Sequence, residues 1–297
     1  MLEALQHLDW RTLVLPAMVP IFIAVLLAEW IRFRGRGRFL LRDTAASMGL
    51  GALYMVFDTL VTVTLVALLF NWAYQHRLFT VTMTPLTGAL LFVLLEFFYY
   101  WFHRASHRIR WFWSAHVAHH SSRYMNFSTA MRQSALYSLA GNWIFYIPLA
   151  FLGFEPVWVF FMLTVNLAYQ YFIHTQWVGK LPRPIEFVFN TPSHHRAHHG
   201  RNPEYIDRNY GGILILYDRL FGTFVEEQET VPVEYGITRP VDSFNPITLT
   251  VHEARDMFRD ALRPGPLRHR LKHFWAPPEW QRPEQETEDG FSRSPAD

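Results

Sequence analysis

The sequence contains no cysteine, and this absence excludes several kinds of chemistry. Without a thiol, the chain cannot form a disulfide, a thiolate-bound iron–sulfur cluster or a thiolate-ligated haem. Charged residues are scarce, at 18% of the 297 residues, and no glycine-rich phosphate loop occurs. The formal net charge of +2 gives no indication of a nucleic-acid partner. Any cofactor of this chain must therefore be held without thiolate ligands.

Apolar residues are present in excess, since 51% of the residues are hydrophobic and 17% are aromatic. A helix needs about 20 apolar residues to cross a bilayer. Because five stretches approach that length, we predict an all-α fold, an integral membrane helical bundle with four to five membrane segments. A short turn at 153–156 joins the last two stretches, so they can also form a re-entrant hairpin. The stretches are Leu13–Ile31, Met48–Phe70, Pro85–Phe102, Ala135–Phe154 and Val157–His174.

Arginines set the orientation that we expect for this bundle. Positive residues next to a helix end stay on the cytoplasmic side, and the first stretch is followed by Arg32, Arg34, Arg36, Arg38 and Arg42. Glu3 and Asp9 precede this stretch and no small-residue cleavage site follows it, which favours a retained anchor over a secretion signal. Counting crossings from there puts every clustered histidine on the cytoplasmic face.

The chain divides into four expected regions. Residues 1–84 hold the first membrane segments, and 85–230 form a core of membrane helices with a cytoplasmic, histidine-rich helical cap. Residues 231–276 are expected to be cytoplasmic or interfacial, because the basic amphipathic stretch Val251–Trp275 is suited to a membrane surface. The tail 277–297 is rich in Pro, Glu and Arg, so we expect it to be disordered.

Histidine is the most unusual feature, because ten of the 15 histidines lie between His103 and His199. Histidines three or four residues apart share one helix face and can point at one metal ion. His174 stands alone, and a lone histidine is more often a structural hydrogen-bonding residue than a ligand. The clusters with ligand spacing are His103 and His107; His116, His119 and His120; and His195, His198 and His199, which His194 precedes.

These clusters predict bound metal. Eight or nine imidazoles at one membrane face would repel one another when protonated near neutral pH, and metal removes that problem. One closed zinc site needs about four ligands, so the supply implies two ions, or one ion with idle donors. Imidazole binds iron, zinc, copper and nickel, so spacing alone does not identify the metal. No role is assigned to His7, His76, His252, His269 and His273, which lack this spacing.

Glu96 and Asp58 are acidic residues within the apolar stretches. Glu96 is seven residues before His103 and shares its helix face, and an ionisable group in a membrane segment is usually functional. We expect Glu96 to accept a ring N–H from a liganding histidine. The alternative is that Glu96 is protonated or paired with an arginine. Asp58 gives a weaker signal of the same kind.

The runs Glu96–Gln133 and Phe187–Phe224 resemble the fatty acid hydroxylase and sterol desaturase superfamily of membrane di-iron enzymes. The resemblance spans roughly His103 to Phe224, with the histidine boxes in the family's order. Within the superfamily, Trp113–Ser122 with Tyr124-Met125-Asn126 is most similar to the alkylglycerol monooxygenase branch and its bacterial relatives. The segment Asn190–Gly200 with Asn209-Tyr210-Gly211 is similar to the same branch.

The resemblance implies a membrane-bound non-haem di-iron oxygenase, which hydroxylates or desaturates an unactivated C–H bond of a lipid. It implies two iron ions, O2 as co-substrate and a separate electron donor, either tetrahydropterin or a cytochrome or ferredoxin system. It makes His174 a ligand as well, and leaves Glu96, Asn126 and His194 as candidate catalytic residues beside the ligands. The implied ligands are His103, His107, His116, His119, His120, His174, His195, His198 and His199.

Two other functions use the same residues. A membrane zinc hydrolase would need an open metal position with a carboxylate base beside it, and the sequence has no His-Glu-x-x-His motif. A metal transporter or sensor would place its site near the bilayer midplane, whereas these clusters gather at one end of the segments. The sequence identifies neither the substrate lipid nor the oligomeric state.

Overall fold

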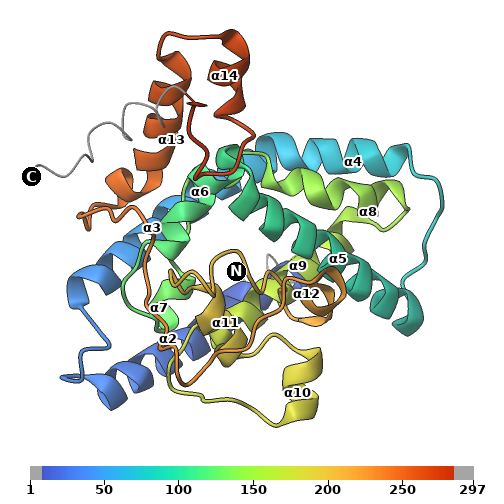
Figure 1. Ribbon diagram of the computed structural model, residues 1–297. Helices are drawn as coiled ribbons and strands as arrows, with labels where there is room; N and C mark the ends of the chain where they lie inside the picture. The colour runs from blue at the N-terminus through green and yellow to red at the C-terminus, as the bar shows by residue number, and fades with distance from the viewer. Residues whose placement is uncertain (1–8, 284–297) are drawn as a thin grey trace, which may run out of the picture.

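The computed structural model describes residues 9–283, and this part of the chain is all helical, with two isolated bridges in place of a sheet (Figure 1). The predicted all-α fold is therefore confirmed. His7 and the residues from 284 onward, which hold most of the tail expected to be disordered, lie outside the described residues.

Four helices are long and apolar enough to cross a membrane. They are α2 (Val14–Phe33), the continuous helix made by α3 (Leu41–Val61), a π-helical turn and α4 (Ala67–Gln75), then α5 (Pro85–Arg108) and α9 (Pro156–Ile173). Their outer faces expose large apolar side chains, as lipid contact requires. The structure is that of an integral membrane protein.

The predicted segment Ala135–Phe154 is not a continuous helix, so four of the expected four to five membrane segments are long helices. It contains turns, the 3-10 helix η3 (Asn142–Tyr146) and the short helix α8 (Ile147–Phe151). Gly141 has a φ of +85° just before η3, and Pro148 brings no N–H to α8. Together these residues interrupt helical hydrogen bonding, although the composition is apolar enough for a span.

The broken segment still ends beside the loop between α4 and α5. The N–H of Leu78 donates to the carbonyl of Phe151 at 2.7 Å, and that of Val81 donates to Gly153 at 3.2 Å. Gly153 has a φ of +103°, and a Cβ there would lie 2.1 Å from the carbonyl oxygen of Phe79. Only glycine fits this close approach. The hairpin therefore reaches the same end of the bundle as the 71–84 loop, as the predicted order of crossings requires.

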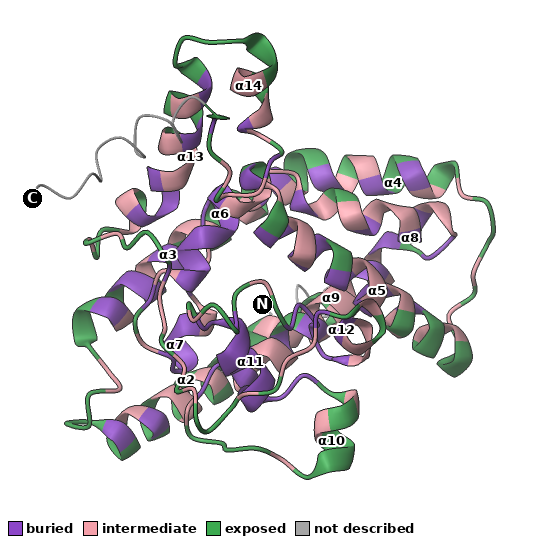
Figure 2. Cartoon of the chain, viewed as in Figure 1, coloured by how far each residue is buried: buried purple, intermediate pink, exposed green. Residues whose placement is uncertain are grey.

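A cap of short helices covers the other end of the bundle (Figure 1). The arginine-rich loop lies at this end too, because Arg38 donates to the carbonyl of Gln176 at 3.3 Å and accepts a hydrogen bond from Asn126. Figure 2 shows that α6 and α11 are mostly buried. The cap helices are α6 (Arg110–His120), α7 (Phe127–Ala130), α10 (Arg183–Val188), α11 (Pro192–His198) and α12 (Leu216–Phe221).

The last two helices, α13 (Pro246–Leu262) and α14 (Leu267–Lys272), form a hairpin beside α6. The start of α13 abuts α3, since a Cβ on Gly49 would lie 2.9 Å from Pro246 Cγ. One side of α13 exposes the apolar residues Ile247, Val251, Phe258 and Leu262.

Residues 277–283, which begin the predicted disordered tail, fold back against this hairpin. Arg282 is 3% exposed and donates to the carbonyls of Arg263 and Pro264. The expectation of disorder is therefore wrong for these seven residues. Charge and proline content indicated disorder, but a buried arginine with several acceptors orders the segment.

Candidate metal centre

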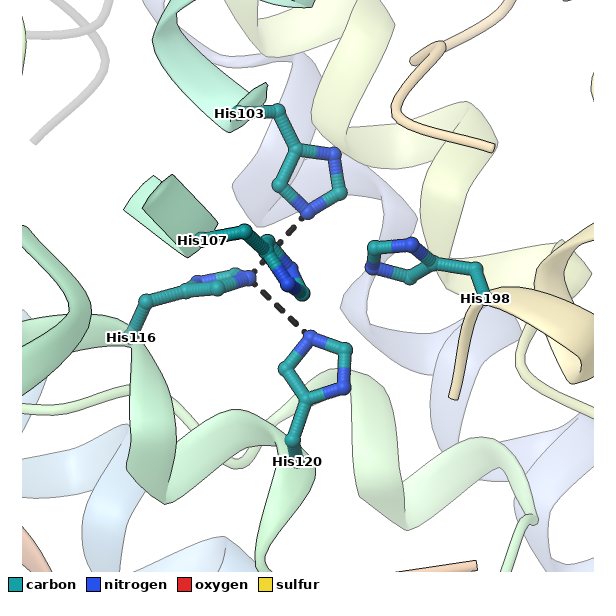
Figure 3. A group of neighbouring side chains, drawn as sticks. All are labelled: His103, His107, His116, His120 and His198. Carbon is teal, nitrogen blue, oxygen red and sulfur yellow. Dashed lines mark hydrogen bonds between the residues drawn. The ribbon is translucent and has the colours of Figure 1, made fainter. Parts of the chain in front are cut away.

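Helices α5 and α6 bring two pairs of histidines together. The capping box of Thr84 starts α5, which places His103 and His107 one turn apart in its last turns. Ile109 has extended backbone angles, so α5 ends and α6 begins in a new direction at Arg110. His116 and His120 on α6 then face the pair on α5 (Figure 3).

Five histidines from three helices form the first group. Their ring nitrogens all lie within 4.8 Å of one another. The Nε2 of His116 is 3.1 Å from the Nε2 of His103 and 3.1 Å from that of His120. Figure 3 shows the rings pointing toward a common centre. The members are His103, His107, His116, His120 and His198.

Four histidines form the second group, again within 4.8 Å: His119, His174, His195 and His199. The Nε2 of His174 is 3.1 Å from that of His119 and 2.9 Å from that of His195, whose Nε2 is 3.2 Å from that of His199. The rings of His120 and His199 stack at 4.3 Å, so the two groups are neighbours. All nine predicted ligands are buried and divide between these two groups.

Backbone carbonyls hold the outer nitrogens of several rings. The Nδ1–H of His103 donates to Tyr210 O at 2.8 Å and that of His198 donates to Arg208 O at 2.8 Å. The Nδ1–H of His174 donates to Gln170 O at 2.6 Å. Since a neutral imidazole carries one N–H, the Nε2 atoms of these three rings are bare acceptors that face inward. This tautomer is the one that binds metal through Nε2.

The inner contacts cannot all be hydrogen bonds. A ring nitrogen offers one lone pair or one N–H, yet the Nε2 of His174 meets two other Nε2 atoms. In the first group the Nε2 atoms of His107 and His198 are buried without a hydrogen-bond partner in the described part of the chain. A cation shared by these lone pairs removes both conflicts. Two nitrogens about 2.1 Å from one ion and at right angles lie about 3.0 Å apart, in agreement with the contacts observed.

The protonation state of the rings suits metal binding. Burial lowers the pKa of His174 to about 4. Burial, with neighbouring imidazoles adding to it, places six further pKa values well below the ordinary histidine value: His116, His119, His120, His195, His198 and His199. Histidines binding metal must be neutral, so these rings need no deprotonation near pH 7.

A loop with unusual backbone angles orients the first group. Asp207 and Asn209 have φ values of 59° and 57°, in the left-handed region that Asp and Asn tolerate better than other side chains. The Nδ2 of Asn209 donates to the carbonyls of His194 and Val225 and so fixes the turn. The Oδ1 of Asp207 also lies 3.5 Å from the Nδ1 of His107. The sequence alone indicates no role for Asp207 and Asn209, although Asp and Asn two residues apart are typical of such turns.

Within residues 9–283, Glu96 forms no hydrogen bond with a histidine, so the expected hydrogen bond from a ring N–H is wrong. Its carboxylate accepts from the N–H of Ile213 at 2.7 Å, from the N–H of Leu214 at 2.9 Å and from the Asn166 amide. These backbone groups follow Tyr210, whose carbonyl holds His103. Glu96 therefore acts on the histidines through the loop rather than directly. Helical spacing placed Glu96 on the helix face of His103, but it did not indicate which groups lie opposite its carboxylate.

The other two candidate catalytic residues also lie outside the histidine groups. The Nε2 of His194 is 2.8 Å from Glu186 on α10, so its ring is directed away from both groups. Asn126 caps α7, accepting from the N–H of Ser128 and donating to the carbonyl of Arg38 at 3.3 Å. Among the described residues, neither side chain touches one of the nine inward-facing rings.

Two buried acids in the first membrane helices support the centre and were missed by sequence analysis. Glu29 accepts from Thr175, which follows His174, and from the N–H of Phe127. Asp43 pairs with buried Arg132 at 3.1 Å, and the carbonyl of Arg132 lies 3.3 Å from the Nδ1 of His119. Glu29 could have been found by the reasoning applied to Glu96, since it too is an acid within an apolar stretch.

Comparison with known proteins agrees with this geometry. The fatty acid hydroxylase family matches residues 88–223, which include all three histidine clusters. Alkylglycerol monooxygenase of Homo sapiens is 41% identical over 240 residues, covering 78% of this chain and 52% of that protein. The Danio rerio alkylglycerol monooxygenase is 42% identical over 231 residues, covering 76% and 50%. Ornithine lipid hydroxylase OlsE of Rhizobium tropici is 30% identical over 149 residues, covering 50% and 45%.

The chain spans about half the length of these curated relatives. No solved structure was found to match it. The family match runs from α5 through α12, and so contains the helices that carry all nine inward-facing histidines. The resemblance predicted from the histidine boxes and their flanking motifs is confirmed, since residues 88–223 of this chain match the fatty acid hydroxylase family.

Proposed function

We propose that this chain is a membrane-bound non-haem di-iron oxygenase that hydroxylates an unactivated C–H bond of a lipid with O2 and electrons from a separate donor. The observation that carries the proposal is the division of nine buried histidines into a group of five and a group of four. Two ions account for that division, since one closed site takes about four ligands. Iron is chosen because imidazole binds it well and the relatives are named monooxygenases and a hydroxylase.

In this proposal all nine inward-facing histidines are ligands. The two irons, when bound, supply the O2-dependent oxidation of a C–H bond. The chain supplies the positions of the imidazoles, because the carbonyls of Gln170, Arg208 and Tyr210 fix which ring nitrogen faces inward. Burial of every ring keeps bulk water from the centre.

The apolar side of the centre supports a lipid substrate. The hydroxyl of Tyr137 lies 3.3 Å from the Nδ1 of His116, and the ring of Tyr99 lies 5.5 Å from the ring of His103. Both tyrosines pack against the hydrophobic core among the membrane helices. We infer that a lipid chain approaches from this side while its head group stays at the interface.

The names of the relatives guide the choice of substrate to test. Two are alkylglycerol monooxygenases and one is an ornithine lipid hydroxylase, so a glycerol ether lipid is our first candidate and an ornithine lipid the second. Hydroxylation adds one oxygen to the lipid. Desaturation, which removes two hydrogens, is the alternative outcome on the same centre.

We place the centre on the cytoplasmic side, because positive loops are retained there and the loop of Arg38 contacts the cap. Since no flavin, haem or iron–sulfur motif occurs in the sequence, the electrons come from outside the chain. A tetrahydropterin and a cytochrome or ferredoxin system are the two donors to compare. Glu96, Asn126 and His194 are proposed as positioning residues that act through neighbouring groups.

The test uses the full chain purified in lipid nanodiscs with iron. We expect about two irons per chain, and O2 consumption only when a lipid and a reductant are both present. Mass spectrometry should show a product heavier than the substrate by one oxygen. The variant His195→Ala should lose this activity, whereas His76→Ala, an exposed histidine outside both groups, should keep it. A preparation that holds only zinc and takes up no O2 after iron loading would reject the proposal.

Neither rival function gains support. A zinc hydrolase needs a carboxylate base at an open metal position, but Asp207 approaches the outer nitrogen of His107 and is paired with Arg108. A transporter needs a site near the bilayer midplane, whereas the histidines lie in the cap and the adjoining helix ends. Product formation without O2 would favour the first rival, and metal flux into sealed vesicles the second.

A further inference from the structure

A second polar site lies mostly outside residues 88–223, between α13, the start of α6 and the segment that follows α14. It is a partly open cavity of about 200 Å³. One water molecule occupies about 30 Å³ in the liquid, so the cavity is large enough for a small ligand. The cavity is lined by Arg110, Arg239, Asp256, Arg259, Asp260, Arg263, His273, Trp280 and Gln281.

The lining carries a surplus of positive charge, with four arginines and two aspartates. Each aspartate is already shared between two arginines. Asp260 lies 2.9 Å from Arg110 and 3.5 Å from Arg263. Asp256 is shared in the same way by Arg259 and by Arg255, which lies outside the lining. Four charges minus two leave a surplus of two positive charges in the lining itself. Just outside the lining, Glu253 pairs with Arg110 at 2.7 Å and Arg282 adds another positive charge beside His273, so the surplus remains.

Hydrogen bonding shows the same shortage of acceptors. The Nδ1 of His273 faces the Nη1 of Arg110 at 3.2 Å, and its Nε2 faces the Nε of Arg282 at 3.0 Å. Burial and the neighbouring arginines lower the pKa of His273 to about 4, so its ring is neutral at pH 7. A neutral imidazole has one N–H and one lone pair, so only one of these arginines can donate to it. The N–H of the other arginine has no acceptor on this ring.

We propose that this cavity binds a small dianion of the phosphate type. A guanidinium fork pairs with two phosphate oxygens, and a phosphate supplies an acceptor for the N–H that His273 leaves unmatched. The indole of Trp280 forms one wall and can pack against an organic group attached to the phosphate. The two negative charges of a phosphate dianion match the two surplus positive charges in the lining.

The position of the cavity favours a soluble phosphate ester over a lipid headgroup. Its residues on α13, Asp256, Arg259 and Asp260, are on a different helix face from the exposed apolar side chains of Val251 and Leu262. If the apolar face lies on the bilayer, the cavity opens toward water. Arg110 begins α6, so the ligand would bind one end of the helix that carries three of the inward-facing histidines. The proposed site does not depend on the oxidative function.

The test is binding to the full chain in phosphatidylcholine nanodiscs. Calorimetric titration with inorganic phosphate and with glycerol phosphate should show saturable binding of one ligand per chain. The double variant Arg239→Gln/Arg263→Gln should weaken this binding about ten-fold or more, since each lost charge-assisted pair is worth about that factor. Both side chains are exposed, so folding should survive, and equal thermal unfolding would verify it. The matched control Arg268→Gln, an exposed arginine outside the lining, should bind as the unmodified chain does.

A second arm identifies the source of the phosphate. Nanodiscs that contain phosphatidic acid should leave the affinity for glycerol phosphate unchanged if the cavity faces water. Phosphatidic acid could instead compete with glycerol phosphate, and the double variant could abolish that competition. This result would retain the site but make its ligand a lipid headgroup. The proposal fails if no phosphate compound binds saturably, or if the double variant binds as tightly as the unmodified chain.

Discussion

The carboxylate of Glu96 accepts a hydrogen bond from the backbone N–H of Ile213 at 2.7 Å, which joins a membrane helix to a loop 117 residues later in the chain. The same loop presents the carbonyl of Tyr210 to His103. Glu96 is 1% exposed, so water cannot replace its carboxylate as the acceptor for the N–H groups that donate to it. A carboxylate in the membrane region is thereby linked to the orientation of a proposed metal ligand.

We therefore expect Glu96→Ala to lower both stability and metal content. The change leaves two N–H groups and one amide without their acceptor, and each buried unsatisfied donor costs about 1–3 kcal/mol. Glu96→Gln keeps one acceptor oxygen and should be milder. The measurements are thermal unfolding and metal per chain by mass spectrometry. Glu155→Ala, at an exposed glutamate, is the control, and full metal retention in Glu96→Ala would contradict this account.

The sequence predicted the ligand positions well because helical geometry is local. His103 and His107, like His116 and His120, are four residues apart, so any regular helix aligns them. Helical spacing could not predict that the nine histidines divide into a group of five and a group of four. It depends on the tertiary approach of α11 and of the end of α9, which sends His198 to one group and His195 to the other.

Similar limits apply to other predictions. Hydropathy does not distinguish a continuous helix from the broken segment Ala135–Phe154, because both are apolar. The break depends on Gly141 and Pro148. The supporting carbonyls of Gln170, Arg208 and Tyr210 carry no sequence signal, since every residue has a carbonyl. The partners of Glu96 come from a loop more than 100 residues away.

The two histidine groups lead to a prediction about metal stoichiometry. His107→Ala removes a donor from the first group only, and His195→Ala removes one from the second only. His195→Ala leaves three donors in the second group and should lose about one of two ions, whereas His107→Ala leaves four in the first group, which suffice for one closed site, and should keep both ions. Metal per chain by mass spectrometry gives the answer. His194→Ala should keep both ions, since its ring faces Glu186. Equal metal content in all three variants would refute the division.

The buried ion pair between Asp43 and Arg132 should be essential for folding of the cap. Removing one partner of a buried pair typically costs about 3–5 kcal/mol, because the other charge stays buried and unpaired. We expect Asp43→Ala to show that loss in thermal or denaturant unfolding. Asp43→Ala combined with Arg132→Met should recover part of it, since no lone charge remains. Asp242→Ala, at an exposed aspartate, serves as the control, and a single variant as stable as this control would exclude the role.

The apolar side of α13 gives the last prediction, that this helix lies on the membrane surface. Ile247, Val251, Phe258 and Leu262 are exposed along one face, and α13 starts beside Gly49, where the second predicted membrane segment begins. A water-facing helix would gain nothing from such a stripe, whereas the bilayer boundary would bury it.

The absence of cysteine makes the measurement direct, because any introduced cysteine is the only labelling site. Spin labels on Val251→Cys and Leu262→Cys in nanodiscs should be more accessible to O2 than to a water-soluble nickel chelate. A label on Arg259→Cys, at an exposed position on another face, should show the opposite preference. Equal nickel accessibility at all three positions would show that α13 projects into water, and the cap would then contact the bilayer only through its membrane helices.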